Sequence, residues 1–467
     1  MSAARAPWRG RRLHFVGVGG AGLSAYARAA SELGAQVSGS DSATSAYLER
    51  LADDGVLRAA VGHSAENVPG GEDVEVVYSV AVPGDNVERQ AARRRGLREL
   101  ARAEILAELS ALAPTIAVAG THGKTTTAAM VVHALRGAGA DPGWLIGGAP
   151  GEGLPNGHWG AGEWLVIEAD ESDRSMLGLE VEIAVLTSAE LDHHATFASE
   201  AEVREAFRSF LARARRAMVV RDEPELIALA DSTAPGADGS ERAAAPARGA
   251  GEPELVPYRA GEFTLTPDGS RFAWRGLEVR LRVPGAHNVA NATAALEAAR
   301  RAGADPARAA GALARFTGAG RRFELLGESE RGARVYDDYA HHPTEIAATV
   351  LAARTLEPQR LIAVFQPHLY SRTALLAREF GRALAGAEIA CVLDVYPARE
   401  RAEEHPGVSG LTIAEATADA AAGRPVYWLP TFADAEPVLR GLLGAGDVCL
   451  VMGAGDVDRL ARGLVAG

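Results

Sequence analysis

A lysine and several hydroxyl side chains follow a glycine-containing turn near the end of the first quarter of the chain. The turn reads Gly120-Thr-His-Gly-Lys-Thr-Thr and lies between a predicted strand, 115–119, and a predicted helix. Backbone N–H groups at a helix N-terminus bind phosphate oxygens, Lys124 can neutralise their charge, and the Thr125 hydroxyl can hold Mg²⁺. The spacing departs from G-x4-G-K-T, because Val118 stands where the first glycine would fall. The segment still predicts a phosphate-binding loop.

Two runs of acidic and histidine side chains follow the next two predicted strands, 164–168 and 183–186. The runs are Glu168-Ala-Asp-Glu-Ser-Asp173 and Glu190-Leu-Asp-His-His194. Because parallel strands end at the same edge of a sheet, we expect both runs to lie beside the phosphate-binding loop. Carboxylate oxygens suit Mg²⁺, and a histidine ligand is less usual. Each run alone is typical of a solvated loop, but together with Lys124 they predict a magnesium site.

An earlier glycine turn begins at Gly17 and reads Gly17-Val-Gly-Gly-Ala-Gly22. It follows a predicted strand, 13–18, opens a predicted helix, 23–33, and is followed by Asp41. Such glycines let the backbone approach a pyrophosphate, and an acid about 20 residues further on can bind a ribose hydroxyl. The turn therefore predicts a pyrophosphate-linked nucleotide. By itself it does not separate NAD from a nucleotide sugar.

The last third of the chain concentrates polar side chains where predicted strands meet loops. The segments are Arg321-Arg322, Asp337-Asp-Tyr-Ala-His-His-Pro-Thr-Glu345 and Gln366-Pro-His-Leu-Tyr-Ser-Arg372. Arginine pairs suit a phosphoryl group or a carboxylate, and the histidines and acids could orient an amine. A zinc site at His341 and His342 is the alternative. Before these segments, Asn288 and Asn291 stand at a predicted helix start, where either amide could be a cap or recognise a base, and one of the two is expected to be a cap.

Alternating apolar strands and alanine-rich helices predict an α/β protein of three domains, 1–113, 114–317 and 318–467. Within the central domain a helix is expected over 200–215, and alternating strands over 254–283 suggest a small antiparallel insert. Further strands are expected near residues 335, 362, 389, 426 and 448. The Ala-, Gly- and Pro-rich segment 231–251 is expected to be a mobile surface loop.

Composition excludes several classes of protein. The 467 residues carry a formal net charge of -13, which argues against a nucleic-acid scaffold. The two cysteines cannot form a disulfide framework, so we expect a reducing, cytoplasmic setting. Arginines near the N-terminus precede an apolar stretch, but His14 and the glycines favour a strand and turn over a secretory signal. No run of about 20 apolar residues predicts a membrane span.

Taken together and in order, these motifs resemble the Mur ligase family over nearly the whole chain. The most specific segments are His14-Phe-Val-Gly-Val-Gly-Gly-Ala-Gly-Leu-Ser24, Ser38-Gly-Ser-Asp41, Gly120-Thr-His-Gly-Lys-Thr-Thr-Thr127, Glu168-Ala-Asp-Glu-Ser-Asp173, Pro284-Gly-Ala-His-Asn-Val289 and Asp337-Asp-Tyr-Ala-His-His-Pro-Thr-Glu345. The resemblance implies a Rossmann-like N-terminal domain, a central P-loop ATPase-type domain with a parallel sheet and the antiparallel insert, and a Rossmann-like C-terminal domain that closes over an amino acid. It also implies that the first glycine turn binds UDP and not NAD.

The resemblance further implies ligands and partners. The expected cofactors are ATP and Mg²⁺, and the expected substrates are UDP-N-acetylmuramate and L-alanine. Neither nucleic acid nor membrane is an expected partner, and a monomer or homodimer is expected.

Residue by residue, the resemblance implies three sets of site residues. The UDP-sugar set is Gly19, Gly20, Ala21, Gly22, Ser40, Asp41, His63, Ser79, Asn86 and Arg102. The ATP set is Gly120, Thr121, His122, Gly123, Lys124, Thr125, Thr126 and Asn291, with Thr125, Glu168 and His193 as Mg²⁺ ligands. Tyr339, His341 and Arg372 are expected to meet L-alanine and the acyl intermediate. Lys124, His193, His341 and Arg372 form the expected catalytic set.

Three departures from the family pattern affect these assignments. Ser188 stands where an asparagine is usual, so the role of that amide is lost or taken by Ser188. Leu369 stands where an arginine is common, which leaves substrate carboxylate binding to Arg372. Several members use a carbamylated lysine for Mg²⁺, but no lysine lies between His193 and Arg204, so none is expected here.

The implied reaction is ATP-dependent amide formation. The lactyl carboxylate of the sugar attacks the γ-phosphate to give an acyl phosphate, because a carboxylate cannot lose oxide directly. The L-alanine amine then displaces phosphate through a tetrahedral intermediate, and His341 is the candidate for handling the amine proton.

Three other interpretations remain open on the sequence. The first is a recycling ligase of the same family that joins an intact tripeptide, although the run from Asp337 to Glu345 favours the enzyme that adds L-alanine. The second is an NAD-dependent oxidoreductase, which leaves Lys124 and both acidic runs unexplained. The third is a non-catalytic regulator that binds ATP without turnover.

Overall fold

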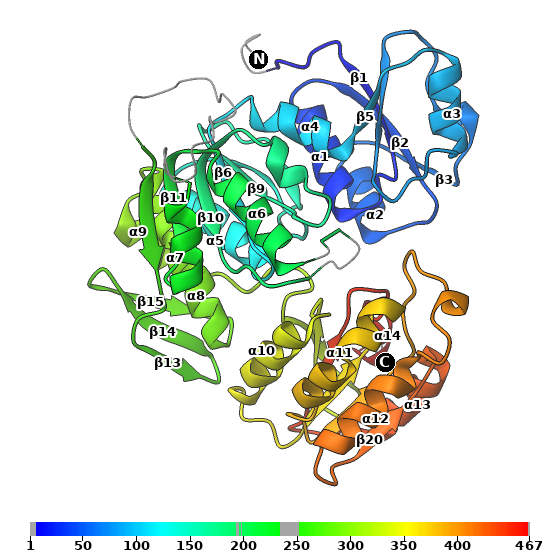
Figure 1. The fold of residues 1–467 in the computed structure, drawn as a ribbon, viewed down its shortest axis with the longest axis vertical. Coiled ribbons are helices and arrows are strands. Elements are labelled where there is room, and N and C mark those ends of the chain that lie inside the picture. Colours follow the sequence, from blue (N-terminus) through cyan, green and yellow to red (C-terminus); the bar gives the residue numbers. More distant parts are fainter. Residues whose placement is uncertain (1–5, 193–195, 198, 234–251, 466–467) are drawn as a thin grey trace. The chain divides into compact units, whose positions relative to one another are not determined.

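The computed structural model describes residues 6–192, 196–197, 199–233 and 252–465 (Figure 1). The chain divides into two compact units. Unit 1 comprises Met1–Arg259 with Ala290–Leu313, and unit 2 comprises Ala260–Val289 with Ala314–Gly467. Most of the predicted loop at 231–251 lies outside the described residues.

The first sheet of unit 1 has five parallel strands in the order β3-β2-β1-β4-β5. These strands are β1 Arg12–Val16, β2 Gln36–Asp41, β3 Ala60–Val61, β4 Val74–Tyr78 and β5 Glu99–Ala101. The accompanying helices are α1 Ala21–Glu32, α2 Ala46–Asp53, η2 Ala65–Asn67, α3 Val87–Arg94 and α4 Arg102–Ser110. The strand order reverses between β1 and β4, and ligands of open α/β sheets bind at such a switch point. The predicted strand at 13–18 and helix at 23–33 are confirmed by β1 and α1.

The second sheet of unit 1 has seven strands in the order β12-β11-β10-β6-β9-β7-β8. All pairs are parallel except β7 with β8. The strands are β6 Thr115–Ala119, β7 Gly143–Leu145, β8 Gly157–His158, β9 Leu165–Glu168, β10 Val181–Leu186, β11 Ala214–Arg221 and β12 Glu254–Tyr258. The helices are α5 Lys124–Gly137, η3 Ser175–Gly178, α6 Glu200–Leu211, α7 Pro224–Asp231, α8 Ala286–Arg301, where the boundary between the units falls, and α9 Pro306–Leu313. Strand β6 lies between β9 and β10, so the loop that follows β6 begins between the ends of these two strands.

Two predictions for the central region are wrong. The helix expected over 200–215 ends at Leu211, and β11 begins at Ala214. Two arginines in the first half of this strand obscure the strand pattern of its apolar second half. One of them, Arg215, pairs with Glu180, the residue before β10. The strand at 254 also does not belong to the insert. It forms β12 and extends the parallel sheet beside β11.

Unit 2 contains the confirmed antiparallel insert and a six-stranded sheet. The insert is β13 Phe263–Thr266, β14 Gly269–Trp274 and β15 Leu277–Leu281. The larger sheet has the order β16-β17-β21-β18-β19-β20 and is parallel except for β16. Its strands are β16 Glu324–Glu328, β17 Arg334–Asp338, β18 Leu361–Phe365, β19 Ile389–Val392, β20 Val426–Trp428 and β21 Val448–Met452. The helices are α10 Pro343–Arg354, α11 Tyr370–Leu384, η4 Ala402–Glu404, α12 Gly410–Ala420, α13 Phe432–Leu442 and α14 Asp458–Val465.

The five strands predicted for this last region are confirmed, but the edge strand β16 was not predicted. Its sequence contains Gly327, where the register shifts and weakens the strand pattern. Central strand β18 packs one alternating set of side chains on each face: Ala363 and Phe365 join one apolar cluster, while Ile362 and Val364 join another. Both faces of this sheet are therefore covered.

Among the described residues, no helix combines the length and the apolar character needed to cross a bilayer.

Candidate functional site

The loop between β6 and α5 requires glycine at two positions. Gly120 has φ +134°, and a Cβ there would overlap Thr187 Oγ1. Gly123 has φ +80° directly before the first residue of α5, and a Cβ there would lie 2.7 Å from Asn291 Oδ1. These values lie in the left-handed region that favours glycine. The loop thus approaches its neighbours more closely than any other residue type would permit.

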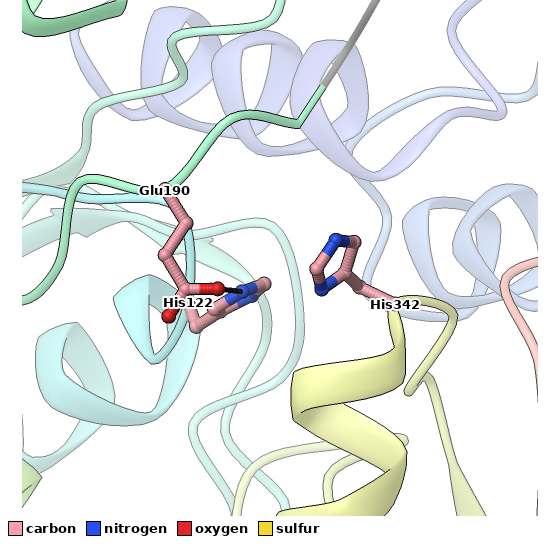
Figure 2. Close-up of side chains that lie close together, drawn as sticks. All are labelled: His122, Glu190 and His342. Atoms are coloured by element: carbon pink, nitrogen blue, oxygen red, sulfur yellow. Dashed lines mark ion pairs between the residues drawn. The ribbon is translucent and has the colours of Figure 1, made fainter. Parts of the chain in front are cut away.

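Hydrogen bonds fix this loop to the segment after β10. The Thr121 N–H donates to Ser188 O at 3.2 Å, and the Glu190 N–H donates to Thr121 Oγ1 at 2.9 Å. The His122 N–H donates to Ser188 Oγ at 3.0 Å, which gives the serine at this departure from the family pattern a defined contact. His122 Nε2 also lies 3.4 Å from Glu190 Oε2. Figure 2 shows this ion pair. His342, also drawn there, belongs to unit 2 and is described with it.

Lys124 is the first residue of α5 and the single lysine in the sequence. Its Nζ donates to Gly120 O at 2.7 Å, to Thr121 O at 3.1 Å and to Glu171 Oε1 at 2.9 Å. Burial by itself would lower the pKa of Lys124, but the Glu171, Asp170 and Glu168 carboxylates raise it. The side chain therefore carries a positive charge at the phosphate-binding loop.

The predicted metal ligands Thr125 and Glu168 lie together. Thr125 Oγ1 donates to Glu168 Oε1 at 2.8 Å, and the Gly147 N–H donates to Glu168 Oε2 at 2.6 Å. The Thr125 hydroxyl in the first turn of α5 and the Glu168 carboxylate at the end of β9 both offer oxygen ligands, which fit Mg²⁺. The third predicted ligand, His193, lies outside the described residues.

Arg102 reaches the acidic run after β9. Its guanidinium lies 3.5 Å from Asp170 Oδ2 and 3.2 Å from Asp173 Oδ2, and its Nε lies 3.2 Å from the position of a Cβ on Gly22. Although burial opposes ionisation, Arg102 and Lys124 hold the pKa of Asp170 at about 2. Within unit 1, Asp170 is therefore influenced by one residue from the predicted UDP-sugar set and one from the ATP set.

The remaining predicted ATP residues lie near the loop, although neither asparagine is an N-cap. Thr126 is buried in the first turn of α5, and Asn291 lies in α8 with its Oδ1 facing Gly123. Asn288 also lies inside α8, and its Nδ2 donates to Pro284 O at 2.8 Å. The cap prediction is wrong because the helix begins earlier than expected, at Ala286.

The first glycine turn is closed by Asp41. Its Oδ2 accepts the Gly19 N–H at 2.7 Å, and a Cβ on Gly19 would lie 2.8 Å from the same oxygen. Gly20 is the N-cap of α1, so the helix N-terminus follows the turn directly, with Ala21 and Gly22 as its first residues. This geometry fits a turn that brings a helix N-terminus close to a pyrophosphate.

Two other predicted UDP-sugar residues lie at and beyond the end of β4. The Ser79 N–H donates to Val16 O at 3.1 Å, and Ser79 Oγ accepts the Ala81 N–H at 3.4 Å. Asn86 is the N-cap of α3, where its Oδ1 accepts the Glu88 N–H at 2.9 Å. Asn86 therefore has a structural role here.

Ser40 and His63 converge on a residue that the sequence analysis missed, Glu88. The Glu88 carboxylate accepts from Ser40 Oγ at 2.8 Å and lies 3.0 Å from His63 Nδ1. No motif indicated Glu88, because it lies within a helix whose other residues are mostly polar. Only its complete burial distinguishes it.

In unit 2, the predicted residues Tyr339, His341 and Arg372 form a cluster with His368. The ring of His341 meets those of Tyr339 and His368 edge to face, at 5.4 and 6.0 Å between centroids. Arg372 is 3% exposed, and its Nη1 lies 3.5 Å from His368 Nδ1. His341 Nδ1 lies 3.0 Å from Tyr339 O. His368 was not assigned a role from the sequence, although its motif was noted.

The other polar residues of this region have structural contacts. His342 is the N-cap of α10, where its Nδ1 accepts the Thr344 N–H. Arg321 pairs with Asp337 at 3.1 Å and donates to Gly453 O and Gly455 O. His341 Nδ1 thus faces Tyr339 O, whereas His342 Nδ1 accepts from Thr344. The contacts of Arg321 favour a structural role for this residue.

The geometry defines a nucleotide-binding α/β protein with a lysine-containing phosphate loop. Three family models match in order: "Mur ligase family, catalytic domain" over 12–113, "Mur ligase middle domain" over 118–299 and "Mur ligase, glutamate ligase domain" over 321–455.

Two curated relatives and one solved structure match nearly the whole chain. The chain is 42% identical to UDP-N-acetylmuramate–L-alanine ligase of Mycolicibacterium vanbaalenii, over 98% of this chain and 96% of the relative. It is 45% identical to the enzyme of that name from Renibacterium salmoninarum, over 97% and 95%. The structure of UDP-N-acetylmuramate–alanine ligase from Thermotoga maritima matches with a TM-score of 0.79 and 27% identity, over 97% and 98%.

The chain belongs to the Mur ligase family. The expected family and its three-domain α/β architecture are confirmed.

Proposed function

We propose that this chain joins L-alanine to the lactyl carboxylate of UDP-N-acetylmuramate, with ATP converted to ADP and phosphate. The observation that carries the proposal is the loop after β6, where Lys124, Thr125 and Glu168 gather at the edge of the sheet. Relatives that carry this activity in their names match over almost the full length. The substrates are small molecules, and we place the reaction in the cytoplasm, where ATP and UDP-sugars are made.

We assign the residues of unit 1 as follows. The loop from Gly120 to Thr126 binds the ATP phosphates, and the Lys124 ammonium balances the charge that develops as the γ-phosphoryl group moves to the sugar carboxylate. Thr125 and Glu168, with His193, would hold Mg²⁺, which when bound neutralises phosphate charge. The first glycine turn, with Asp41, binds the UDP part.

Unit 2 supplies the amino-acid side of the reaction in this proposal. Arg372 binds the substrate carboxylate. His341 takes a proton from the L-alanine amine, and the amine then attacks the acyl phosphate. His341 Nδ1 faces the Tyr339 carbonyl oxygen, which only accepts hydrogen bonds, so in the neutral ring Nδ1 carries the proton and Nε2 the lone pair that acts as the base. Domain boundaries near residues 113 and 317 are part of the same proposal, and the first is supported by the gap between α4, which ends at Ser110, and β6, which begins at Thr115.

Phosphate release tests the proposal. The purified protein, given ATP, Mg²⁺ and UDP-N-acetylmuramate, is expected to release phosphate with L-alanine and to form one equivalent of UDP-N-acetylmuramyl-L-alanine. Release only with the tripeptide would instead identify the recycling ligase. ATP binding without release under any condition would identify a regulator.

A further inference from the structure

Glu88 in α3 is a fully buried acid, with 0% of its surface exposed. It contacts strands β1 and β2 of the five-stranded sheet. Acids are rarely buried completely unless their charge is compensated. Its compensation comes from hydrogen-bond donors on several elements, and two of these donors belong to the proposed UDP-sugar site.

The donors divide between the two carboxylate oxygens. Oε2 accepts from Ser40 Oγ at 2.8 Å and lies 2.8 Å from His14 Nε2. Oε1 lies 3.0 Å from His63 Nδ1 and accepts from Asn67 Nδ2 at 3.0 Å and from the Ser64 N–H at 3.3 Å. The carboxylate thus connects β1, β2, the segment after β3, and η2.

Charge fixes the direction of these bonds. Burial by itself would raise the pKa of Glu88, but hydrogen bonds from His14, Asn67, Ser40 and His63 lower it to about 2. An ionised carboxylate only accepts hydrogen bonds, so the His63 nitrogen facing it must carry a proton.

This arrangement leaves one imidazole nitrogen of His63 for a ligand. Nδ1 is held by Glu88, and the side chain remains 23% exposed. The second histidine of the network, His14, is 1% exposed and uses its other nitrogen on Ser38 Oγ at 2.9 Å. His14 therefore belongs to the support, whereas His63 also reaches the surface.

We propose that Glu88 is a positioning residue for the UDP-sugar. It holds His63 with Nδ1 protonated, so that Nε2 is the nitrogen presented to the nucleotide, and it fixes the Ser40 hydroxyl. The proposal rests on the proposed function, because it assumes that Ser40 and His63 meet the UDP group.

The test is Glu88→Gln, which keeps the size of the side chain but replaces one acceptor oxygen by a donor NH₂. We expect Kd for UDP and KM for UDP-N-acetylmuramate to rise about 10- to 100-fold, the range for hydrogen bonds to a charged group, while kcat at saturation and Kd for ADP stay unchanged. Exposed Glu66 in η2 gives the matched control, and Glu66→Gln should change none of these values.

A measurement on the unaltered protein keeps the proposal testable if Glu88→Gln does not fold. The ¹⁵N chemical shifts of His63, assigned by comparison with His63→Asn, should show a protonated Nδ1 at pH 7.5. A neutral ring with its proton on Nε2, or a Glu88→Gln protein that folds and binds UDP as tightly as the unaltered one, would overturn the proposal. Failure of the unaltered protein to bind UDP would instead overturn the proposed function.

Discussion

The Lys124 ammonium lies 2.9 Å from a Glu171 oxygen, so under the proposed function an ATP phosphate would compete with this carboxylate for the positive charge. Glu171 is 2% exposed. Breaking a buried ion pair by removing one partner typically costs about 3–5 kcal/mol, whereas replacing both partners is often close to neutral. Stability and catalysis can therefore be separated at this pair.

We predict that Lys124→Ala lowers both stability and activity. The buried Glu171 carboxylate loses its ammonium partner, so the melting temperature should fall, and turnover should drop about 10²- to 10³-fold because one charge-stabilising group is gone. Scanning calorimetry and phosphate release measure the two effects.

The double variant Lys124→Ala with Glu171→Gln is the control for this prediction. It should recover most of the melting temperature but none of the turnover. Near-normal turnover of folded Lys124→Ala would contradict the assignment of the phosphate-binding loop. Because the chain has a single lysine, no second lysine could replace the lost ammonium.

At the scale of elements, the position of β6 between β9 and β10 gives the site its composition. The loop after β6 is held on one side by the segment after β10 and on the other by the carboxylates after β9. Both sets of contacts require the main chain of the loop to pass close to Thr187. Gly120 is the residue at this close approach.

Gly120→Ala should therefore weaken ATP binding and destabilise the loop. Its φ of +134° costs about 1–3 kcal/mol for a residue with a Cβ, and overlap with Thr187 Oγ1 would push the loop away from β10. Isothermal titration with ADP should show a lower affinity. Gly311→Ala is the control, because that glycine lies in α9 with no atom within 4 Å of a new Cβ, so binding should be unchanged. Unchanged affinity in Gly120→Ala would show that the loop is not the ATP site.

At the scale of the whole molecule, the pKa values of buried carboxyl groups are shifted in opposite directions in the two units. In unit 1, the lowered pKa values of Glu88 and Asp170, both about 2, contribute stability that is present at neutral pH and lost as pH falls toward 2. In unit 2, burial raises the pKa of Asp338 to about 7, so its contribution is full below its unfolded value near 3.8 and is lost as pH rises through 7. Burial also lowers the pKa of His287 in unit 2 to about 4, so the stability that the neutral imidazole contributes is lost as pH falls from 6.5 to 4. Protonation of Asp338 over nearly the same range offsets that loss, because its pKa is shifted in the opposite direction by a similar amount.

We predict that acid unfolding between about pH 4.5 and 2 begins in unit 1. The shift of Glu88 alone, from 4.5 to about 2, corresponds to about 3 kcal/mol lost over that range. Hydrogen exchange with mass spectrometry at pH 3 and pH 7 should show peptides of β1, β2 and α3 losing protection before those of β18 and β21. Earlier loss in unit 2 would contradict the prediction. The Glu88→Gln protein should show a flatter acid limb.

Much of the molecule follows from local sequence. The two glycine turns and the apolar strands before them have strong local patterns, so the central strands, the glycine loop that carries Lys124 and the family were predictable before any coordinates. The end of the helix at Leu211 and the position of β12 were not predictable. The arginines of β11 are compatible with a helix, and the alternating apolar residues at 254–258 are compatible with an antiparallel strand. Only the pairing of these strands with their neighbours in the sheet decides between the two structures.

The site divides in the same way. Sequence alone placed the acidic run after β9 beside the loop that carries Lys124, since parallel strands end at one edge of a sheet. It could not select Glu171 from four acids, nor find Glu88, because burial and hydrogen bonding depend on which elements pack together. The sequence by itself determined which types of side chain follow each strand and glycine turn. Only the tertiary structure decided which carboxylates are desolvated and which donors they hold, since those interactions join residues far apart in sequence.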